Sequence, residues 1–303
     1  MYYDFHTSIE DIAVGPQNSV YVYVVEYNED ATGRPMVDDR IHEFNARGAF
    51  VRLWADHWDW EPLRESQRPT VITVRDDGLV YIAVTHTVAG LEEASIQEFT
   101  DDGQFLRVLG DDTWEIGRPT GLALGSTDSI YITDSEYSLV REFRIEGKPV
   151  RTWGGRGSNT GKFLYPDDIT VGPDGSVYVA DTGNRRIQRF TATGDFVRAW
   201  GIEGTGPDEF LWPTGIAAGP DGSVYVADTG NDRVQQFTAR GDFVRAWNGG
   251  PGVGRGEFVG RLRVAVGNDG AVYVVDAGTN CVQKFTSEGE FVRAWGEIAN
   301  VQW

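Results

Sequence analysis

The chain has 303 residues and a formal net charge of −19, from 46 acidic and 27 basic side chains. Nucleic acids are bound through basic patches and anionic membranes attract basic segments, so this balance argues against both as partners. No apolar run of about 18 residues occurs, and no basic stretch followed by an apolar one opens the chain, so we expect neither membrane insertion nor a signal peptide.

The acidic composition is also poor in lysine, which occurs only at Lys148, Lys162 and Lys284. An acidic, lysine-poor surface suits a protein in concentrated salt, where repulsion between like charges is screened. We therefore expect a halophilic source, although a preference for arginine codons would leave the same trace. Cys281 is the only cysteine, which excludes an intrachain disulfide, and no histidine or acid stands beside it. We expect a buried, inert thiol there.

The first three units of the chain, residues 10–54, 70–109 and 119–153, each indicate four short β-strands. Runs of β-branched and aromatic residues are bounded by glycine, aspartate and asparagine, as strands and turns require. In the first two units, insertions at 26–39 and 85–94 separate the second strand from the third.

The next two units, residues 166–200 and 213–247, repeat each other almost residue for residue. Each holds the turn G-P-D-G, the strand S-V-Y-V-A, the turn D-T-G-N and the strand F-V-R-A-W. Proline presets the first corner of a turn, and glycine and asparagine tolerate a positive φ. A sixth unit at 262–295 follows the same plan.

Recurring anchor residues count the units. The tyrosine of the second strand recurs at Tyr21, Tyr81, Tyr131, Tyr178, Tyr225 and Tyr273. The phenylalanine of the third strand recurs at Phe44, Phe99, Phe143, Phe190, Phe237 and Phe285. Both faces of the strand at 176–180 are apolar, so a lone meander cannot cover itself, whereas copies stacked around an axis can. We predict an all-β fold, a six-bladed β-propeller of four-stranded antiparallel blades that forms one domain over residues 1–303.

The repeated pattern also carries a resemblance to a known family. P-x-G-I-A, then P-D-G-S-V-Y-V-A-D-T-G-N, then R-[IV]-Q-x-F and F-V-R-A-W resembles the NHL repeat, closely over residues 119–296 and more loosely over 10–110. The resemblance implies a six-bladed propeller. It implies no single function, because propellers of this family serve as lyases, lactonase relatives, RNA readers, sensor ectodomains and scaffolds.

The loops of such a propeller should differ between its two faces. In an antiparallel meander, the turns between strands 2 and 3 share one face with the connections between blades, and the sequence places its extra residues there. Variable loops on a rigid scaffold usually carry binding. We therefore expect a partner to contact this face over blades 1 to 3.

Histidine and tryptophan supply the candidate binding residues of that face. They are His57, Trp58, Trp60, His86 and Trp114. Exposed tryptophans are frequent hot spots for protein partners and can stack on sugar rings. The alternative for Trp212 is a packing role, and the alternative for the histidines is a zinc site, which needs three or four converging ligands. The resemblance implies that zinc-dependent lyases of the family hold the metal with histidines from several blades around the axis. Since no histidine follows His86 here, that pattern is broken, and we expect no metal there.

The axis supplies a second candidate set. The residues that open the first strands should lie nearest the central channel, and they are Asp11, Val71, Gly121, Asp168, Gly215 and Arg263. In lactonase relatives a divalent cation is held at this place, as the resemblance implies. Asp11, Asp168 and Arg263 suit an ion pair better than a Ca²⁺ site, which takes six or more oxygens. We expect no cofactor; an axial Ca²⁺ or Zn²⁺ belongs to the alternative function.

Other recurring residues have structural explanations. The aspartate of D-T-G-N recurs once per blade, at Asp181, Asp228 and Asp276, and is expected to form a turn. Phe163, Phe210 and Phe258 share a Gly-x-Phe spacing and are expected to be packing anchors.

Each blade is complete in itself, so we expect the ring to close by packing of blade 6 against blade 1. The tail at 298–303 would cover that seam or pair with another copy. The sequence favours a non-catalytic binding or structural propeller with a protein or glycan partner or self-association, for example in a filament or at an extracellular or virion surface. The alternative is a metal-dependent lyase or lactonase-like enzyme that uses the central channel.

Overall fold

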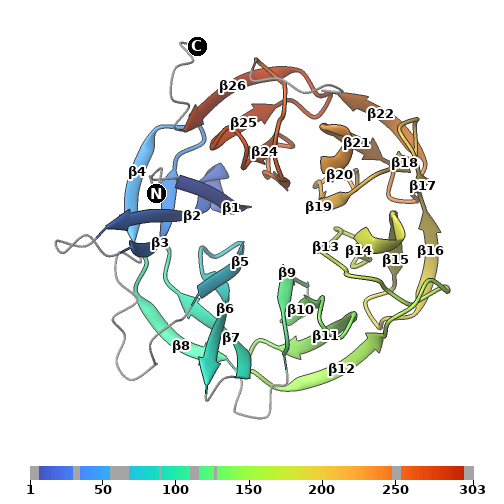
Figure 1. The fold of residues 1–303 in the computed structure, drawn as a ribbon, viewed down its shortest axis with the longest axis horizontal. Coiled ribbons are helices and arrows are strands. Elements are labelled where there is room, and N and C mark those ends of the chain that lie inside the picture. Colours follow the sequence, from blue (N-terminus) through green and yellow to red (C-terminus); the bar gives the residue numbers. More distant parts are fainter. Residues whose placement is uncertain are drawn as a thin grey trace.

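The computed structural model describes residues 7–29, 35–54, 68–88, 91–109, 116–125, 128–247 and 254–296. The fold is a six-bladed β-propeller, in which six four-stranded antiparallel sheets surround a central axis (Figure 1). The all-β class and the number of blades are therefore as predicted. Within the described residues, the helical content is three single 3₁₀ turns, η1 (Pro16–Asn18), η2 (Thr182–Asn184) and η3 (Thr229–Asn231). No helix in this part of the chain is long and apolar enough to cross a membrane.

The strands follow one another outwards from the axis in every blade. Blade 1 holds β1 (Thr7–Val14), β2 (Val20–Glu29), β3 (Pro35–Phe44) and β4 (Phe50–Trp54). Blade 2 holds β5 (Arg68–Val74), β6 (Val80–Val88), β7 (Leu91–Phe99) and β8 (Phe105–Leu109). Blade 3 holds β9 (Pro119–Leu124), β10 (Ser129–Asp134), β11 (Leu139–Arg144) and β12 (Pro149–Gly154).

The same order continues in the second half of the chain. Blade 4 holds β13 (Asp168–Val171), β14 (Val177–Asp181), β15 (Arg186–Phe190) and β16 (Phe196–Trp200). Blade 5 holds β19 (Pro213–Ala218), β20 (Val224–Asp228), β21 (Arg233–Phe237) and β22 (Phe243–Trp247). Blade 6 holds β23 (Leu262–Val266), β24 (Val272–Asp276), β25 (Cys281–Phe285) and β26 (Phe291–Gly296). A short parallel pair, β17 (Ile202–Glu203) with β18 (Glu209–Phe210), lies in the connection between blades 4 and 5.

The hydrophobic core lies between the blades rather than inside them. One cluster joins Tyr178 and Trp200 of blade 4 to Ile216 and Phe237 of blade 5. This confirms that both faces of each sheet are covered by stacking, as the strand pattern requires. The expected packing anchors Phe163, Phe210 and Phe258 are fully buried.

A tryptophan-on-glycine contact links successive blades and also closes the ring. Trp200 of blade 4 lies over Gly241 in the turn between strands 3 and 4 of blade 5, and Trp295 of blade 6 lies over Gly48 of blade 1 in the same way. Gly48 has φ +72° and a Cβ there would meet the Trp295 ring at 2.6 Å, so only glycine fits. The seam therefore closes by packing, as predicted. The tail at 298–303 lies outside the described residues.

The two long insertions form β-structure over most of their length. The pairing of β2 with β3 continues from Val20↔Phe44 to Glu29↔Pro35, and that of β6 with β7 continues to Val88↔Leu91. The insertions at 26–39 and 85–94 therefore extend two hairpins on the face that carries the turns between strands 2 and 3.

A β-bulge at the start of the first strand recurs around the ring. Register shifts occur between Ile9 and Asp11, between Pro69 and Val71, and between Pro213 and Gly215. A bulge inserts one residue and changes the direction of its side chain. The inserted residues of blades 1, 2, 3 and 5 are Glu10, Thr70, Thr120 and Thr214, and all four line the cavity described next.

Candidate functional site

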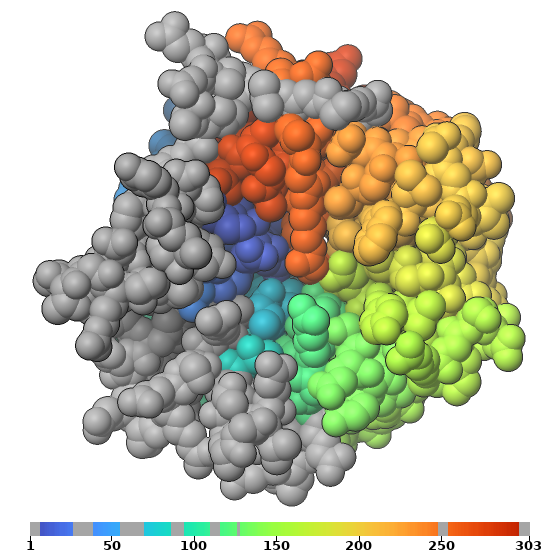
Figure 2. All heavy atoms as spheres, viewed as in Figure 1, coloured from blue at the N-terminus to red at the C-terminus, as the bar shows by residue number. Residues whose placement is uncertain are grey.

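A central cavity of about 1170 Å³ opens on what we call the connection face, the face with the connections between blades and the turns between strands 2 and 3. Figure 2 looks onto this face, where the described parts of the blades converge on a central hollow. All six blades contribute lining residues. A cavity of this size is large enough for a drug-sized ligand or a short segment of a polymer.

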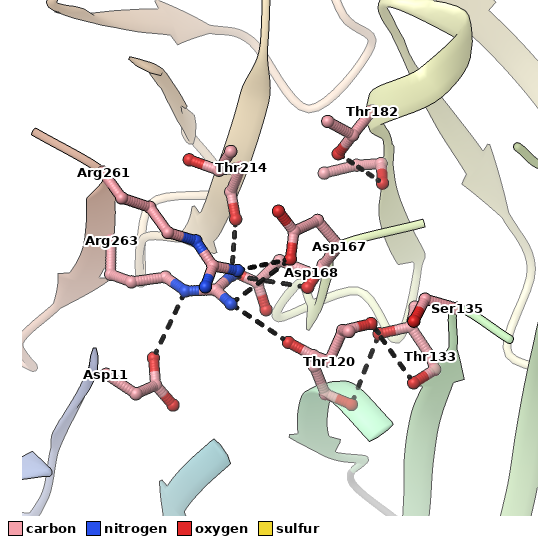
Figure 3. Close-up of polar contacts among 12 residues, drawn as sticks. Asp11, Thr120, Thr133, Ser135, Asp167, Asp168, Thr182, Thr214, Arg261 and Arg263 are labelled. Carbon is pink, nitrogen blue, oxygen red and sulfur yellow. Dashed lines mark hydrogen bonds and ion pairs between the residues drawn. The ribbon is translucent and has the colours of Figure 1, made fainter. Parts of the chain in front are cut away.

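The floor of the cavity is built around one buried arginine. Arg263, at the start of β23, is 3% exposed and extends across the axis (Figure 3). Its guanidinium donates to the carbonyl oxygens of Thr120 in blade 3 and Thr214 in blade 5. It also lies within ion-pair distance of three carboxylates, Asp11 at 3.9 Å, Asp167 at 3.4 Å and Asp168 at 3.8 Å. One side chain therefore ties blade 6 to blades 1, 3, 4 and 5.

The carboxylates of Asp11 and Asp168, which together with Arg263 we call the hub, also connect neighbouring blades. Asp11 accepts a hydrogen bond from the backbone N–H of Ile72 in blade 2, at 2.8 Å. Asp168 does the same for Ile216 in blade 5, also at 2.8 Å. The structure thus brings the predicted axial residues Asp11, Asp168 and Arg263 together, with both carboxylates engaged in bonds between blades.

Burial sets the electrostatics of this floor. Loss of hydration raises the pKa of Asp168 to about 7, although Arg263 opposes the shift, and burial likewise raises the pKa of Asp11. Burial alone would lower the pKa of Arg263, but Asp167, Asp168 and Asp11 together raise it above its ordinary value. The guanidinium thus stays charged while the two carboxylates resist ionisation.

A narrower cavity of about 150 Å³ continues along the first strands beyond Asp11 and Asp168. Among the residues that the structure describes, no group of three or more histidine, cysteine, aspartate or glutamate side chains is arranged to hold a metal ion.

The entrance of the cavity carries four side chains, which we call the mouth residues: Arg118, Tyr165, Trp212 and Arg261. Arg118, Tyr165 and Trp212 each precede the proline that leads into the first strand of a blade. Trp212 is 60% exposed and Tyr165 is 53% exposed, whereas the anchor aromatics of the blades are buried. Arg261 donates to Asp167 at 2.6 Å and lies beside Arg263 (Figure 3). That neighbouring guanidinium, followed by burial, lowers the pKa of Arg261.

The aspartates of the repeated turn hold the segments that carry the mouth residues. Asp228, fully buried, accepts from the backbone N–H of Leu211 at 3.0 Å and from the side chains of Asn231 and Arg233. Asp134 accepts from the N–H groups of Gly117 and Arg118 in blade 3. Asp181 and Asp276 likewise accept the N–H groups of Leu164 and Val259, so the structural role expected for Asp181, Asp228 and Asp276 is confirmed.

The structure places the other sequence-predicted residues as follows. His57, Trp58, Trp60 and Trp114 lie outside the described residues. His86 lies in β6, paired in register with Glu93, and its side chain is outside the described part. Trp212 is exposed, which overturns the packing alternative for it. Burial raises the pKa of the Cys281 thiol to about 11, as expected for an unreactive cysteine.

The sequence interpretation did not single out Arg118, Tyr165 and Arg261. They occupy one position of the repeat, just before the first strand of a blade, at which the residue type changes. Blades 3 to 6 have arginine, tyrosine, tryptophan and arginine there, at positions 118, 165, 212 and 261. A variable position within an otherwise constant repeat, always at the axis end of a strand, was the available signal.

Comparison with known proteins agrees with this architecture. The family model described as the NHL repeat matches residues 163–190, 210–237 and 262–285. A search of curated proteins gives no match.

Solved structures share the fold at low sequence identity. Virginiamycin B lyase from Staphylococcus aureus has a TM-score of 0.61 at 17% identity, covering 98% of this chain and 90% of that one. A protein of unknown function from Bacteroides thetaiotaomicron has a TM-score of 0.63 at 16% identity, covering 93% and 71%. The WD40 repeats of RRP9 reach 0.61 at 14% identity, covering 98% and 83%. At such identities the likeness concerns the fold alone.

Proposed function

Since three stretches of this chain match the NHL repeat and its fold is a six-bladed β-propeller, we propose that it is a non-catalytic binding module whose partner enters the central cavity of the connection face. The observation that carries the proposal is the exposure of Trp212 and Tyr165 in the cavity lining, at 60% and 53%. Exposed large aromatics at a concave site are the side chains that most often dominate binding energy.

The floor of the cavity supports binding rather than metal-dependent chemistry. A lyase or lactonase-like enzyme using the channel would need free oxygen ligands at the axis. Asp11 and Asp168 instead accept backbone N–H groups from the next blade and surround Arg263, whose positive charge disfavours a cation beside it. The partner contact first expected over blades 1 to 3 is accordingly proposed for the whole ring, with described contact residues in blades 3 to 6.

The test blocks the cavity without touching the hub. Ser135 lines the entrance, and within the described part of the chain its hydroxyl makes one long hydrogen bond, 3.4 Å to the Arg118 carbonyl. We expect Ser135→Trp to abolish binding of ligands found by screening carbohydrate and peptide arrays. The matched control is Ser287→Trp, in a turn between strands 3 and 4 on the opposite face, which should bind as the wild type does.

A metal analysis completes the test. We expect purified protein to carry no stoichiometric Ca²⁺ or Zn²⁺. One bound ion per chain, lost in Asp11→Asn and Asp168→Asn, would contradict a non-catalytic function. Equal binding by Ser135→Trp and Ser287→Trp would contradict the central cavity as the binding site.

A further inference from the structure

We propose that the ligand of the central cavity is an acidic carbohydrate, a uronate-bearing glycan held by the four mouth residues Arg118, Tyr165, Trp212 and Arg261. This inference rests on the proposed binding function and adds the chemical class of the ligand. The juxtaposition behind it is a pair of exposed aromatic rings on blades 4 and 5, flanked by arginines on blades 3 and 6.

The mouth residues are held at equivalent places by the fold. The carbonyls of Arg118, Trp212 and Arg261 each accept the N–H of the residue that follows the turn aspartate, at 2.9–3.0 Å. Tyr165 occupies the same position before its proline in blade 4. At least three of the four side chains therefore stand on backbone that the turns hold in the same way, and their differing chemistry would set the specificity of the site.

The two exposed aromatic side chains, Trp212 and Tyr165, are each held in place by a neighbouring residue. The Trp212 ring lies against Gly230, where a Cβ would come within 2.7 Å of its Cδ1 atom. Tyr165 has φ 49°, a left-handed conformation that is strained for an aromatic residue, and Arg156 stacks on its ring at 5.3 Å. Backbone strain maintained at a cavity entrance is typical of ligand sites. Flat, exposed aromatic faces suit the apolar face of a pyranose ring.

The charges of the entrance favour an anion although the whole chain is acidic. Among the described lining residues, the arginines are Arg118, Arg185, Arg261 and Arg263, and the acids are Glu10, Asp39 and Asp167. Asp167 is engaged by Arg261 and Arg263, while Glu10 and Asp39 belong to blade 1. Arg118 is exposed and forms no ion pair within the described part of the chain.

A carboxylate is the anion that this arrangement fits. Arginine presents a planar fork that matches a carboxylate in a bidentate manner. Arg261 lies beside a second guanidinium, that of Arg263, and its pKa is lowered for this reason. Asp167 already lies against both guanidinium groups, and a bound carboxylate would bring a second negative charge to them.

The hydrogen-bonding groups of the lining favour a sugar over a peptide. A peptide that binds by strand addition needs free backbone donors and acceptors, but the carbonyls of Arg118, Trp212 and Arg261 are bonded to the repeated turns. What remains is side chains, including a set of threonine hydroxyls. Thr120 and Thr182 donate to carbonyls of the next blade at 2.6–2.8 Å, so their oxygens remain acceptors for sugar hydroxyls. Thr214 donates to Leu262 in the same way, but its oxygen already contacts the Thr229 hydroxyl.

The experiment is calorimetric titration with trimers of galacturonate, glucuronate and mannuronate, each beside its methyl ester. We expect at least one acid trimer to bind, and Trp212→Ala to weaken it about tenfold or more. Arg118→Gln should weaken the acid trimer about tenfold and leave the affinity for the methyl ester unchanged. The matched control is Tyr137→Ala, because Tyr137 is 50% exposed but does not line the cavity; its affinity should equal that of the wild type.

The other outcomes separate this inference from the proposed function. Failure of every acid trimer to bind at millimolar concentration overturns the inference, as does an ester that binds as tightly as its acid. If the peptide Asp-Tyr-Asp binds instead and Trp212→Ala weakens it, the ligand class is wrong and the proposed function stands. A ligand of any class whose affinity is unchanged in both Trp212→Ala and Ser135→Trp would contradict the ligand class and the proposed function alike.

Discussion

The hub and the mouth of the central cavity differ in how they use their polar groups, although in blades 4 and 6 the mouth residue lies only a few residues before the hub residue of the first strand. At the hub, Arg263 and Asp11 are buried and Asp168 is half-buried, and all three are bonded to neighbouring blades. At the mouth, Trp212 and Tyr165 are more than half exposed, and Arg118 has no ion-pair partner within the described residues. The comparison indicates that the charged groups at the axis of this propeller hold the blades together, whereas the exposed side chains at the mouth are available to a ligand.

The largest expected effect is a difference in the free energy of unfolding between substitutions of the two arginines of blade 6, Arg263 at the hub and Arg261 at the mouth. Arg263→Met removes a buried guanidinium that bridges five blades and leaves Asp11, Asp167 and Asp168 without it, so we expect a loss of about 3–5 kcal/mol in the free energy of unfolding. Arg261→Met removes a partly exposed ion pair and should cost less than about 1 kcal/mol. Denaturant titration of the two variants measures both values. Equal losses would show that hub and mouth are not distinct.

The second expected effect concerns the turn that supports the mouth. Asp228→Asn replaces a carboxylate oxygen that accepts from Arg233 and Asn231 with an amide N–H that cannot accept, so we expect a loss of about 2–3 kcal/mol. The control is Asp232→Asn in the same turn, at φ 49°, a conformation that asparagine tolerates. It should change the free energy of unfolding by less than about 0.5 kcal/mol. A milder effect at Asp228 than at Asp232 would refute the structural role of the motif.

The third expected effect is the pH dependence of the hub. Because burial raises the pKa of Asp168 from its ordinary 3.8 to about 7, the folded state binds a proton that the unfolded state lacks between about pH 4 and pH 7. The free energy of unfolding contributed by Asp168 therefore falls as the pH rises through this window. Asp168→Asn should remove this contribution. The measurement is the free energy of unfolding of the wild type and of the variant at pH 5 and at pH 8, and the wild type should lose more stability between these two pH values than the variant does.

Asp174→Asn is the control for that experiment. Burial alone would raise the pKa of Asp174, but hydrogen bonds from the Ser176 backbone and side chain lower it on balance, so its stabilisation is lost only as the pH falls through acid values. The control should therefore keep the wild-type slope between pH 5 and pH 8. A variant of Asp168 with an unchanged slope would show that this carboxylate is ionised in the fold.

The repeat made the fold predictable, and the hub nearly so. Tyrosine, phenylalanine and glycine recur at fixed offsets, so blade number and strand order follow from spacing, and counting to the first strand places Asp11, Asp168 and Arg263 at one axis. The mouth was harder, because side-chain exposure there depends on bulges and on the close approach of Gly230 to Trp212. Spacing alone reports neither of these tertiary features.

The smallest expected effect tests backbone strain at the mouth. The difference in stability between a glycine and an alanine variant should have opposite signs at positions 165 and 118. Tyr165 has φ 49°, a left-handed conformation that costs about 1–2 kcal/mol for a residue with a Cβ, whereas Arg118 does not have a positive φ. At position 165, glycine should therefore be more stable than alanine by about 1 kcal/mol. At position 118, glycine should be less stable than alanine by about 0.5–1 kcal/mol, since only its greater freedom in the unfolded chain counts. Comparing the four variants by thermal unfolding isolates the backbone, because each pair lacks the large side chain. The same sign at both positions would mean that Tyr165 is not strained, and the mouth would then lose one of the features that distinguish it from the hub.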